Sequence, residues 1–260
     1  MYISIPEDIT IQSRYQKVDI LGENVKGSVK TMDLKKTRIS NIAIRGMYTC
    51  LNKYFGDLKW WPAKSRFEVI VGAILTQNTS WKNVEKAVKE LRSRKLLGLS
   101  RLLKADDAVI QSAIKCTGYY KQKTQTLKNI CAFLYSECGH DLKKSLCLDT
   151  KLFRAKLLAV KGIGNETADS ILLYAFNRPV FVVDAYSVRI FTRHNLVKEN
   201  AKYRDVQHMV HNALGCNVSK FNQFHALLVE VGKQFCHKSV PKCAECPMKN
   251  ASYKKKISLL

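Results

Sequence analysis

The chain has 260 residues, 46% of them hydrophobic, and its 44 Lys and Arg exceed its 21 Asp and Glu by a formal net charge of +23. These values exclude a disordered chain and allow one large domain or two small ones. The positive charge favours a polyanionic partner, because each neutralised phosphate releases counterions, although a solvated basic surface would give the same composition. No apolar run approaches the length of a transmembrane helix, so we expect no membrane partner.

The first 40 residues mix polar and apolar side chains with little helical period. We interpret residues 1–40 as a basic N-terminal extension, either loosely docked or acting as an arm that touches nucleic acid. They lack the basic start and apolar core of a signal peptide, so we expect an intracellular protein of the cytoplasm and nucleoid, working as a monomer. In that compartment the nine Cys should be reduced or bound to metal.

Hydrophobic spacing becomes helical from Ile42 onward. Phe67, Val71 and Ile74 share one helix face, and Ser80 suits the N-cap of the next helix. Later segments with the same period are 108–114, 121–134, 150–158, 166–176, 185–194, 203–214 and 220–234. Only 180–183 is strand-like, and it is too short to build a sheet. We therefore predict an all-α protein with short loops.

A glycine hairpin lies between two of these helical segments, in the run 158–169. Gly162 and Gly164 permit positive φ and close approach of another backbone. The helix that begins near Asn165 presents free N–H groups and the positive end of its dipole, which together can seat a phosphate. Asp184 follows, just before another helix. Each feature alone also fits an ordinary helical corner or an N-cap Asp, so the prediction depends on the spacing between them.

Four motifs, in this order along the chain, resemble those of the endonuclease III-like DNA glycosylases. They are LTQNT at 75–79, GYYKQK at 118–123, the hairpin LAVKGIGNETAD at 158–169 and VVD at 182–184, and the resemblance runs from about 42 to 248. It implies a helix-hairpin-helix glycosylase fold that acts on double-stranded DNA containing damaged bases. It also implies a six-helix barrel over 65–176 and a second helical domain built from 41–64 and 177–260, with the active site in a cleft between them.

The same resemblance assigns roles to individual residues. Asp184 corresponds to the catalytic acid, which stabilises a cationic sugar and activates water. Gln77 is the candidate wedge that fills the gap left by an extruded base, with Asn78 beside it, although a helix cap or a solvated polar pair fits as well. The residues implied in holding the DNA backbone are Lys161, Gly162, Gly164, Asn165 and Thr167, and we expect Lys121 and Lys123 to add general attraction to phosphates.

Glu166 decides which chemistry the resemblance implies. Bifunctional members of the family carry a Lys at this position, whose amine attacks the sugar C1′ and forms a Schiff base. A carboxylate cannot do this, so we predict a monofunctional glycosylase that hydrolyses the N-glycosidic bond in base excision repair. The alternatives are a bifunctional glycosylase and lyase acting on oxidised pyrimidines, a non-catalytic DNA-binding module, and an iron–sulfur redox protein.

Trp60, Trp61 and Pro62, together with the hairpin sequence, resemble the bacterial 3-methyladenine DNA glycosylase branch. An N-alkylated purine is cationic and leaves easily, so it needs an aromatic wall more than a strong general acid. We expect Trp60, Trp61 and Phe67 to supply that wall, with Glu166 in the same base pocket. The alternative for each Trp is an ordinary place in the core. The predicted substrate is an alkylated purine similar to 3-methyladenine.

Cys236, Cys243 and Cys246 keep the spacing of three ligands in the family's iron–sulfur loop. The fourth position is Ser252 rather than Cys, whereas a [4Fe–4S] cube normally takes four thiolates. Three alternatives follow: Ser252 or another group completes a cluster, the cluster has been lost, or a zinc ion binds with His237 as a further ligand. We favour a [4Fe–4S] cluster with a structural role, which orders a basic loop against phosphate.

Overall fold

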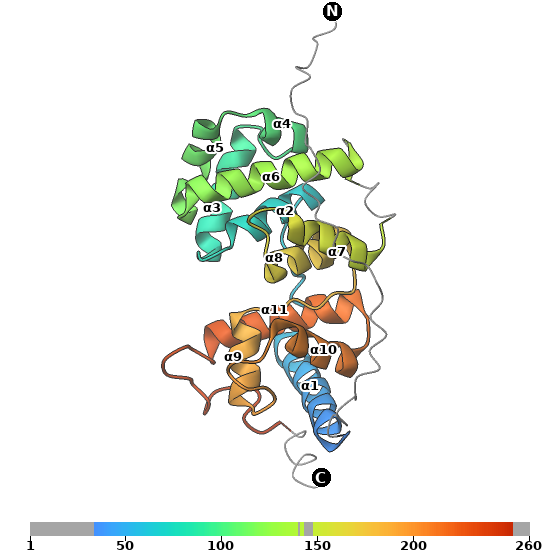
Figure 1. Ribbon diagram of the computed structural model, residues 1–260. Coiled ribbons are helices and arrows are strands. Elements are labelled where there is room, and N and C mark those ends of the chain that lie inside the picture. Colours follow the sequence, from blue (N-terminus) through green and yellow to red (C-terminus); the bar gives the residue numbers. More distant parts are fainter. Residues whose placement is uncertain (1–33, 140, 143–147, 252–260) are drawn as a thin grey trace, which may run out of the picture.

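The computed structural model describes residues 34–139, 141–142 and 148–251, and within these ranges every regular element is helical (Figure 1). This confirms the prediction of an all-α protein. None of the helices in the described ranges is long and apolar enough to cross a membrane. The elements are α1 (Leu34–Phe55), α2 (Arg66–Leu75), α3 (Trp81–Ser93), α4 (Leu99–Lys104), α5 (Asp107–Ile114), the 3₁₀ turn η1 (Lys115–Thr117), α6 (Tyr120–Cys138), α7 (Thr150–Ala159), α8 (Asn165–Ser170), its π-helical continuation η3 (Ile171–Ala175), α9 (Ala185–Arg193), α10 (Tyr203–Leu214) and α11 (Val218–Gln234).

The first helix begins earlier than the hydrophobic spacing indicates. α1 starts at Leu34, within the predicted extension 1–40, whose boundary stays a prediction, and residues 1–33 lie outside the described part of the chain. In sequence, Asp33 directly precedes Leu34, and an Asp at that position is a typical signal for the start of a helix. Its buried face follows the helical period through Ile44, Met47 and Leu51, all fully buried.

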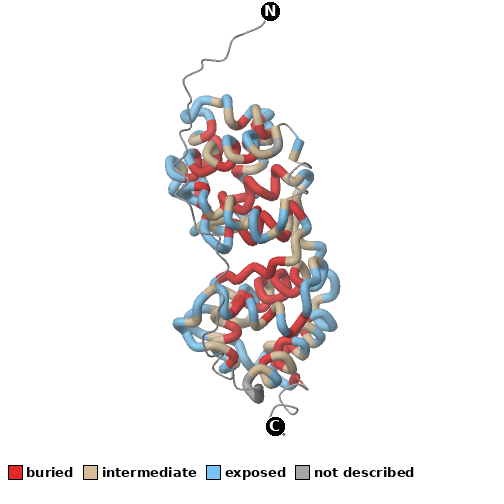
Figure 2. Tube along the Cα trace, turned by 45° about the vertical axis from the view of Figure 1, so that its right-hand side comes forward, coloured by how far each residue is buried: buried red, intermediate tan, exposed pale blue. Residues whose placement is uncertain are grey.

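Two hydrophobic clusters divide the described residues into two lobes (Figures 1 and 2). One cluster lies between Phe67 and Val180 and fills the lobe that contains α2 to α8. The other combines α1 with residues from Leu173 onward, through α9, α10 and α11. α1 contacts α10 and α11, which lie far from it in sequence. This arrangement agrees with the predicted domains, 65–176 against 41–64 with 177–260, whose boundaries remain a prediction.

The segment 180–183, which looks strand-like in sequence, is extended and buried, and no strand lies beside it in the described part of the chain. Side chains of α10, including that of its first residue, Tyr203, hydrogen-bond to the backbone of this segment instead. The N–H of Phe181 donates to His211 Nε2 at 3.0 Å, and its carbonyl accepts from Gln207 Nε2 at 2.7 Å. The N–H of Val183 donates to the Tyr203 hydroxyl at 3.2 Å. The segment is therefore fixed on the second lobe directly before Asp184.

α2 is the apolar centre of the lobe that contains α2 to α8, and its C-terminal end lies beside the hairpin. Ser65 caps it by accepting from the N–H of Glu68 at 3.2 Å. Every residue from Phe67 to Leu75 is buried, including Glu68, whose carboxylate pairs with Arg92 at 2.6 Å. The helix ends at Leu75, so the following LTQNT residues lie beside the hairpin.

Candidate active site

The hairpin joins α7 to α8, and its two glycines serve different purposes. Gly162 has φ +96°, and a Cβ there would lie 2.1 Å from Thr126 Oγ1. Only glycine fits that position in the fold. Gly164 has φ −98°, and a Cβ there would meet nothing within 4 Å. The fold therefore does not require glycine at position 164, and the absence of a side chain leaves the backbone at the tip of the hairpin accessible.

Gln77 and Asn78, the wedge candidates, have different surroundings. The Gln77 amide donates to the Gly162 carbonyl at 3.2 Å and to Thr167 Oγ1 at 3.0 Å, so it braces the hairpin. Asn78 is exposed and has φ +52°. Insertion of Gln77 into a duplex would cost these two hydrogen bonds, whereas Asn78 already projects from the surface. Lys161 is also exposed.

Asp184 caps a helix with one carboxylate oxygen and faces His225 with the other. It is 9% exposed and caps α9, with Oδ1 accepting from the Ser187 N–H at 2.7 Å and from its hydroxyl at 2.8 Å. Oδ2 lies 3.6 Å from His225 Nε2. Burial opposes ionisation, but the interactions with His225 and Ser187 outweigh it and hold the pKa of Asp184 below its ordinary value. The carboxylate is therefore ionised at neutral pH.

The sequence analysis did not identify His225 and Tyr174, two residues linked to Asp184. His225, on α11, is buried, and its Nδ1 is hydrogen-bonded to the Tyr174 hydroxyl at 2.6 Å. Its Nε2 faces Asp184 and has no hydrogen-bond partner among the described residues. Burial, followed by the charge of Asp184, raises the pKa of Tyr174, which keeps its hydroxyl protonated. In sequence, each residue appears only as a polar group within an apolar helix, which gives no hint of its partner.

Glu166 occupies the first turn of α8, at the position that decides the chemistry. Its side chain is exposed in part, yet burial of the carboxyl and then the charge of Asp184 raise its pKa to about 7, against a smaller opposing effect of His225. The site thus contains two carboxyl groups with separated pKa values. Such separation is typical of sites where two acids have different tasks.

An aromatic cluster connects the Trp pair to this site. Trp61 lies 5.1 Å from Trp81 and 5.1 Å from Tyr174 between ring centroids, and Trp60 lies 6.0 Å from Trp61. The ammonium of Lys233 stands 5.3 Å from the Trp60 ring centroid. Trp81 and Tyr174 therefore join Trp60 and Trp61 in one aromatic cluster, and one face of this cluster contacts a cation.

Two sequence-based assignments need correction. Phe67 is 6% exposed and packs in the core of the lobe that contains α2 to α8, so we assign it to packing. Lys123 is also buried, and its ammonium donates to the carbonyls of Leu75 at 2.9 Å and Thr117 at 2.8 Å. Burial lowers its pKa, and it ties α6 to α2 instead of meeting phosphate.

A buried polar network links the hairpin helix to the chain before the catalytic candidate. Asp169, fully buried on α8, accepts from Arg154 Nε at 2.7 Å and from Arg154 Nη2 at 3.0 Å. It also accepts from the Tyr203 hydroxyl and from Gln207 Nε2, both at 2.8 Å. Tyr203 in turn receives the N–H of Val183. This network spans both lobes and fixes the two elements that carry Glu166 and Asp184 relative to each other.

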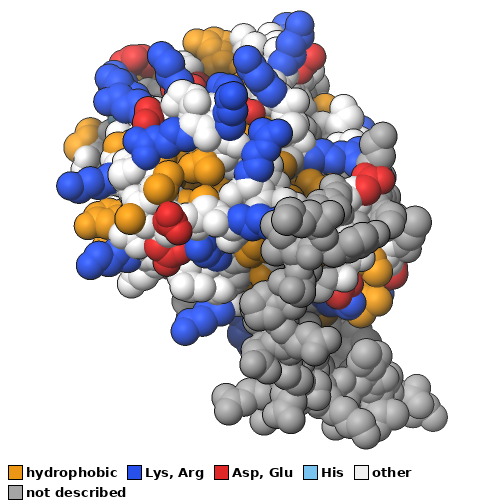
Figure 3. All heavy atoms as spheres, turned by 90° about the horizontal axis from the view of Figure 1, so that it is seen from above, with side chains coloured by type: hydrophobic (Ala, Val, Ile, Leu, Met, Phe, Trp, Pro, Cys, Tyr) orange, Lys and Arg blue, Asp and Glu red, His pale blue; other side chains and the backbone are white. Residues whose placement is uncertain are grey.

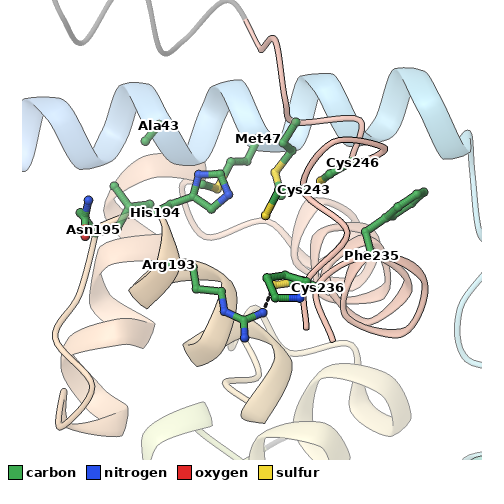
Figure 4. Close-up of a pocket in the computed structure, with 12 residues that line it drawn as sticks. Ala43, Met47, Arg193, His194, Asn195, Phe235, Cys236, Cys243 and Cys246 are labelled. Atoms are coloured by element: carbon green, nitrogen blue, oxygen red, sulfur yellow. Dashed lines mark hydrogen bonds between the residues drawn. The ribbon is translucent and has the colours of Figure 1, made fainter. Parts of the chain in front are cut away.

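The cysteine loop lies at the other end of α9. The three Cys border a cavity of about 400 Å³ between the loop, α1 and the C-terminal end of α9 (Figure 4). Arg193 secures the loop by donating to Cys236 Sγ at 3.1 Å and to the carbonyls of His237 at 2.7 Å and Lys238 at 2.9 Å. Ser252, the fourth predicted position, lies outside the described residues.

Positive charge is distributed widely over the surface. Seen from the α4 and α5 end, Lys and Arg side chains are spread across the molecule between smaller acidic and hydrophobic patches (Figure 3). Dispersed charge attracts DNA in general but selects no base. The site must therefore be located by its geometry, where the hairpin, Asp184 and the aromatic cluster meet.

A model of the HhH-GPD superfamily of base excision DNA repair proteins matches residues 71–214, which include the hairpin and Asp184. The chain belongs to this superfamily. This confirms the relationship predicted from the four motifs.

Relatives and solved structures agree with this classification. A provisionally named DNA repair glycosylase of Methanocaldococcus jannaschii is 43% identical over 204 residues, covering 78% of this chain and 92% of the relative. Endonuclease III of Thermotoga maritima is 29% identical over 188 residues, covering 71% and 81% of the two chains. The structure of the H. pylori 3-methyladenine DNA glycosylase MagIII bound to 1,N6-ethenoadenine matches with a TM-score of 0.64 at 25% identity, covering 75% of this chain and 97% of its own.

Proposed function

We propose that this base excision repair enzyme is a monofunctional DNA glycosylase that releases alkylated purines similar to 3-methyladenine. The observation that carries the proposal is the pair of carboxyl groups at the site. Asp184 is buried and held ionised, and Glu166 stands where a lyase would need an amine. With no nucleophilic Lys at that position, water is the group that attacks the sugar.

The hairpin supports the first step, in which the damaged strand is held. A phosphate can approach the backbone at Gly164, because no side chain and no neighbouring atom occupies the space a Cβ would take. The exposed Lys161 adds positive charge beside it. The target nucleotide then leaves the stack, and Asn78, with Gln77 behind it, is placed to fill the gap.

Asp184 supports the second step, in which the base departs. The bond between the sugar C1′ and the base nitrogen breaks, its electron pair goes to the base, and positive charge develops on the sugar. The Oδ2 oxygen of the Asp184 carboxylate, which faces His225, stabilises this cation. Water then adds to C1′ and gives up a proton, and we assign the same carboxylate as the group that accepts it. His225 and Ser187 hold the carboxylate in place.

The aromatic cluster supports a cationic base as the substrate. The ammonium of Lys233 lies over the Trp60 ring, and this contact supports a cation-binding role for the ring face. Glu166, when ionised, adds a negative charge on the same side of the site as Asp184. The H. pylori glycosylase similar to this chain is named for 3-methyladenine and was solved with 1,N6-ethenoadenine, which supports a modified adenine here.

We also propose that Cys236, Cys243 and Cys246 hold a [4Fe–4S] cluster with a structural role. Their side chains border one cavity. Among the described residues, no three Cys, His, Asp or Glu are grouped closely enough to hold a single metal ion. A cube binds each thiolate on a different iron, so its ligands stand farther apart than those of one zinc ion. When bound, the cluster would order the loop that carries Lys238 and Lys242.

The cellular role follows from this chemistry. We propose that the protein works as a monomer on double-stranded DNA in the cytoplasm and nucleoid, where alkylated bases arise. Its surface charge supports fast association with DNA of any sequence.

The test is release of free base from duplexes that carry one lesion each. We expect release from duplexes containing 3-methyladenine or 1,N6-ethenoadenine, and little from a duplex containing an oxidised pyrimidine. Binding to undamaged duplex is measured in parallel. Release of oxidised pyrimidines would favour the endonuclease III-like alternative. Equal binding to damaged and undamaged DNA without base release would favour a non-catalytic module.

A further inference from the structure

The cavity beside the cysteine loop is bordered by a fourth donor. Besides Cys236, Cys243 and Cys246, its lining includes His194, the C-cap residue of α9. Figure 4 shows the His194 ring and the Cys243 side chain directed into the same space. An imidazole and three thiols therefore surround one cavity, although His194 lies far from the loop in sequence.

The chemistry of the loop calls for such a donor. A [4Fe–4S] cube needs four ligands, and the sequence replaces the fourth Cys with Ser252. A serine hydroxyl must lose a proton before it can bind iron strongly, whereas a neutral imidazole binds through a lone pair it already has. Imidazole also replaces Cys on iron in Rieske centres, so this ligand is compatible with iron–sulfur chemistry.

The backbone of His194 is fixed at the end of α9. Its backbone N–H donates to the carbonyls of Ile190 and Thr192. The preceding residue, Arg193, binds the Cys236 sulfur and two carbonyls of the loop. The imidazole and the thiols therefore belong to parts of the chain that are already tied together. The other polar lining residues, Arg193 and Asn195, offer a permanent cation and a neutral amide, which are poor ligands for iron.

We propose that His194 is the fourth ligand of the [4Fe–4S] cluster held by Cys236, Cys243 and Cys246. The inference rests on the cluster proposed above. It has a consequence for the electronic properties of the centre: a neutral imidazole leaves one negative charge fewer than a fourth thiolate and raises the reduction potential. The hydrogen bond from Arg193 to Cys236 Sγ acts in the same direction.

The experiment measures iron, sulfide and the visible and electron paramagnetic resonance spectra of full-length protein purified without oxygen. We expect about four irons per chain in the wild type. His194→Ala should fall to three or fewer irons and show a three-iron spectrum or none. Ser252→Ala, and His237→Ala as the matched imidazole control, should keep the wild-type values. His194→Cys should keep the cluster and lower its reduction potential.

The readouts separate this inference from the proposed function. Base release and circular dichroism are recorded on the same preparations as measures of activity and folding. Because His194 and Asp184 lie at opposite ends of α9, the iron measurements and the base-release assay report on different sites. The proposal is overturned if the wild type binds no iron, if His194→Ala keeps the wild-type iron content and spectrum, or if Ser252→Ala is the variant that loses iron. Each of these results leaves a positive base-release assay standing.

Discussion

The two ends of α9 have different surroundings. At its N-terminus, Asp184 is buried, and its hydrogen bonds and charge contacts are supplied by Ser187 and His225 of the same chain. At its C-terminus, His194 borders an open cavity that the thiols of Cys236, Cys243 and Cys246 also line. One helix thus joins a site completed by its own residues to one that a cofactor would complete. We propose hydrolysis at the first end and ordering of the loop at the second.

The polarity of the helix suits this division. The N-terminal end of a helix stabilises negative charge, which adds to the hydrogen bonds that keep Asp184 ionised. The C-terminal end favours cations, and Arg193 in the last turn is the basic residue there. The same backbone dipole therefore supports an anionic catalytic group at one end and a cationic clamp on the loop at the other.

The largest effect is expected at the N-terminal end. Asp184→Asn keeps the N-cap, because Asn caps helices as well as Asp, but removes the charge that stabilises the cationic sugar. We expect single-turnover base release to fall about 100-fold or more, with little change in thermal unfolding. Asp149→Asn, which alters the cap of α7, is the matched control and should retain activity. Unchanged base release by Asp184→Asn would mean that the charge of Asp184 is not needed for the reaction.

The buried network should respond in stability more than in chemistry. Asp169→Asn removes the charge that pairs with Arg154 and accepts from Tyr203 and Gln207. We expect the free energy of unfolding to fall by on the order of 3 kcal/mol in urea titrations. Asp205→Asn, at an exposed position on α10, should change it little. An unchanged unfolding free energy in Asp169→Asn would show that the network does not hold the lobes together.

The hairpin glycines offer a matched pair. Gly162→Ala forces a Cβ into Thr126 at positive φ and should cost about 2 kcal/mol of unfolding free energy. Gly164→Ala should leave stability almost unchanged, because its Cβ meets nothing, but weaken binding to duplex DNA. Thermal unfolding and fluorescence anisotropy measure the two effects. Normal DNA binding by Gly164→Ala would exclude close phosphate approach at this position.

The smallest effect concerns pH. The pKa of Glu166 is about 7, so its carboxyl is neutral below that pH and negative above it. For a cationic base, kcat/KM should therefore rise as pH increases through about 7. An interaction of about 1 kcal/mol gives a rise of roughly fivefold. Glu166→Gln should abolish this step, and a neutral lesion such as 1,N6-ethenoadenine serves as the control. A step that persists in Glu166→Gln would point to another group.

The sequence was sufficient for features that short motifs encode. The helices follow from hydrophobic period, the hairpin from Gly162 and Gly164, and Asp184 from its distance to them. Phe67 was misassigned because α2 is apolar on every side, so its sequence does not indicate which face meets a ligand. Tyr174, His225 and Trp81 were missed because each gains its role through contacts between distant helices. The role of Lys123 was misassigned because the sequence does not reveal whether a Lys side chain will lie near buried carbonyl groups.

The central claim is that water, and no amine of the protein, attacks the sugar. One reaction tests it: wild-type protein is incubated with a duplex containing 3-methyladenine in the presence of borohydride, and free base, strand cleavage and covalent adduct are measured together. The account predicts free base, an intact strand at the abasic site and no trapped adduct, because Glu166 replaces the lyase Lys. A borohydride-trapped protein–DNA adduct that forms in step with base release would contradict it.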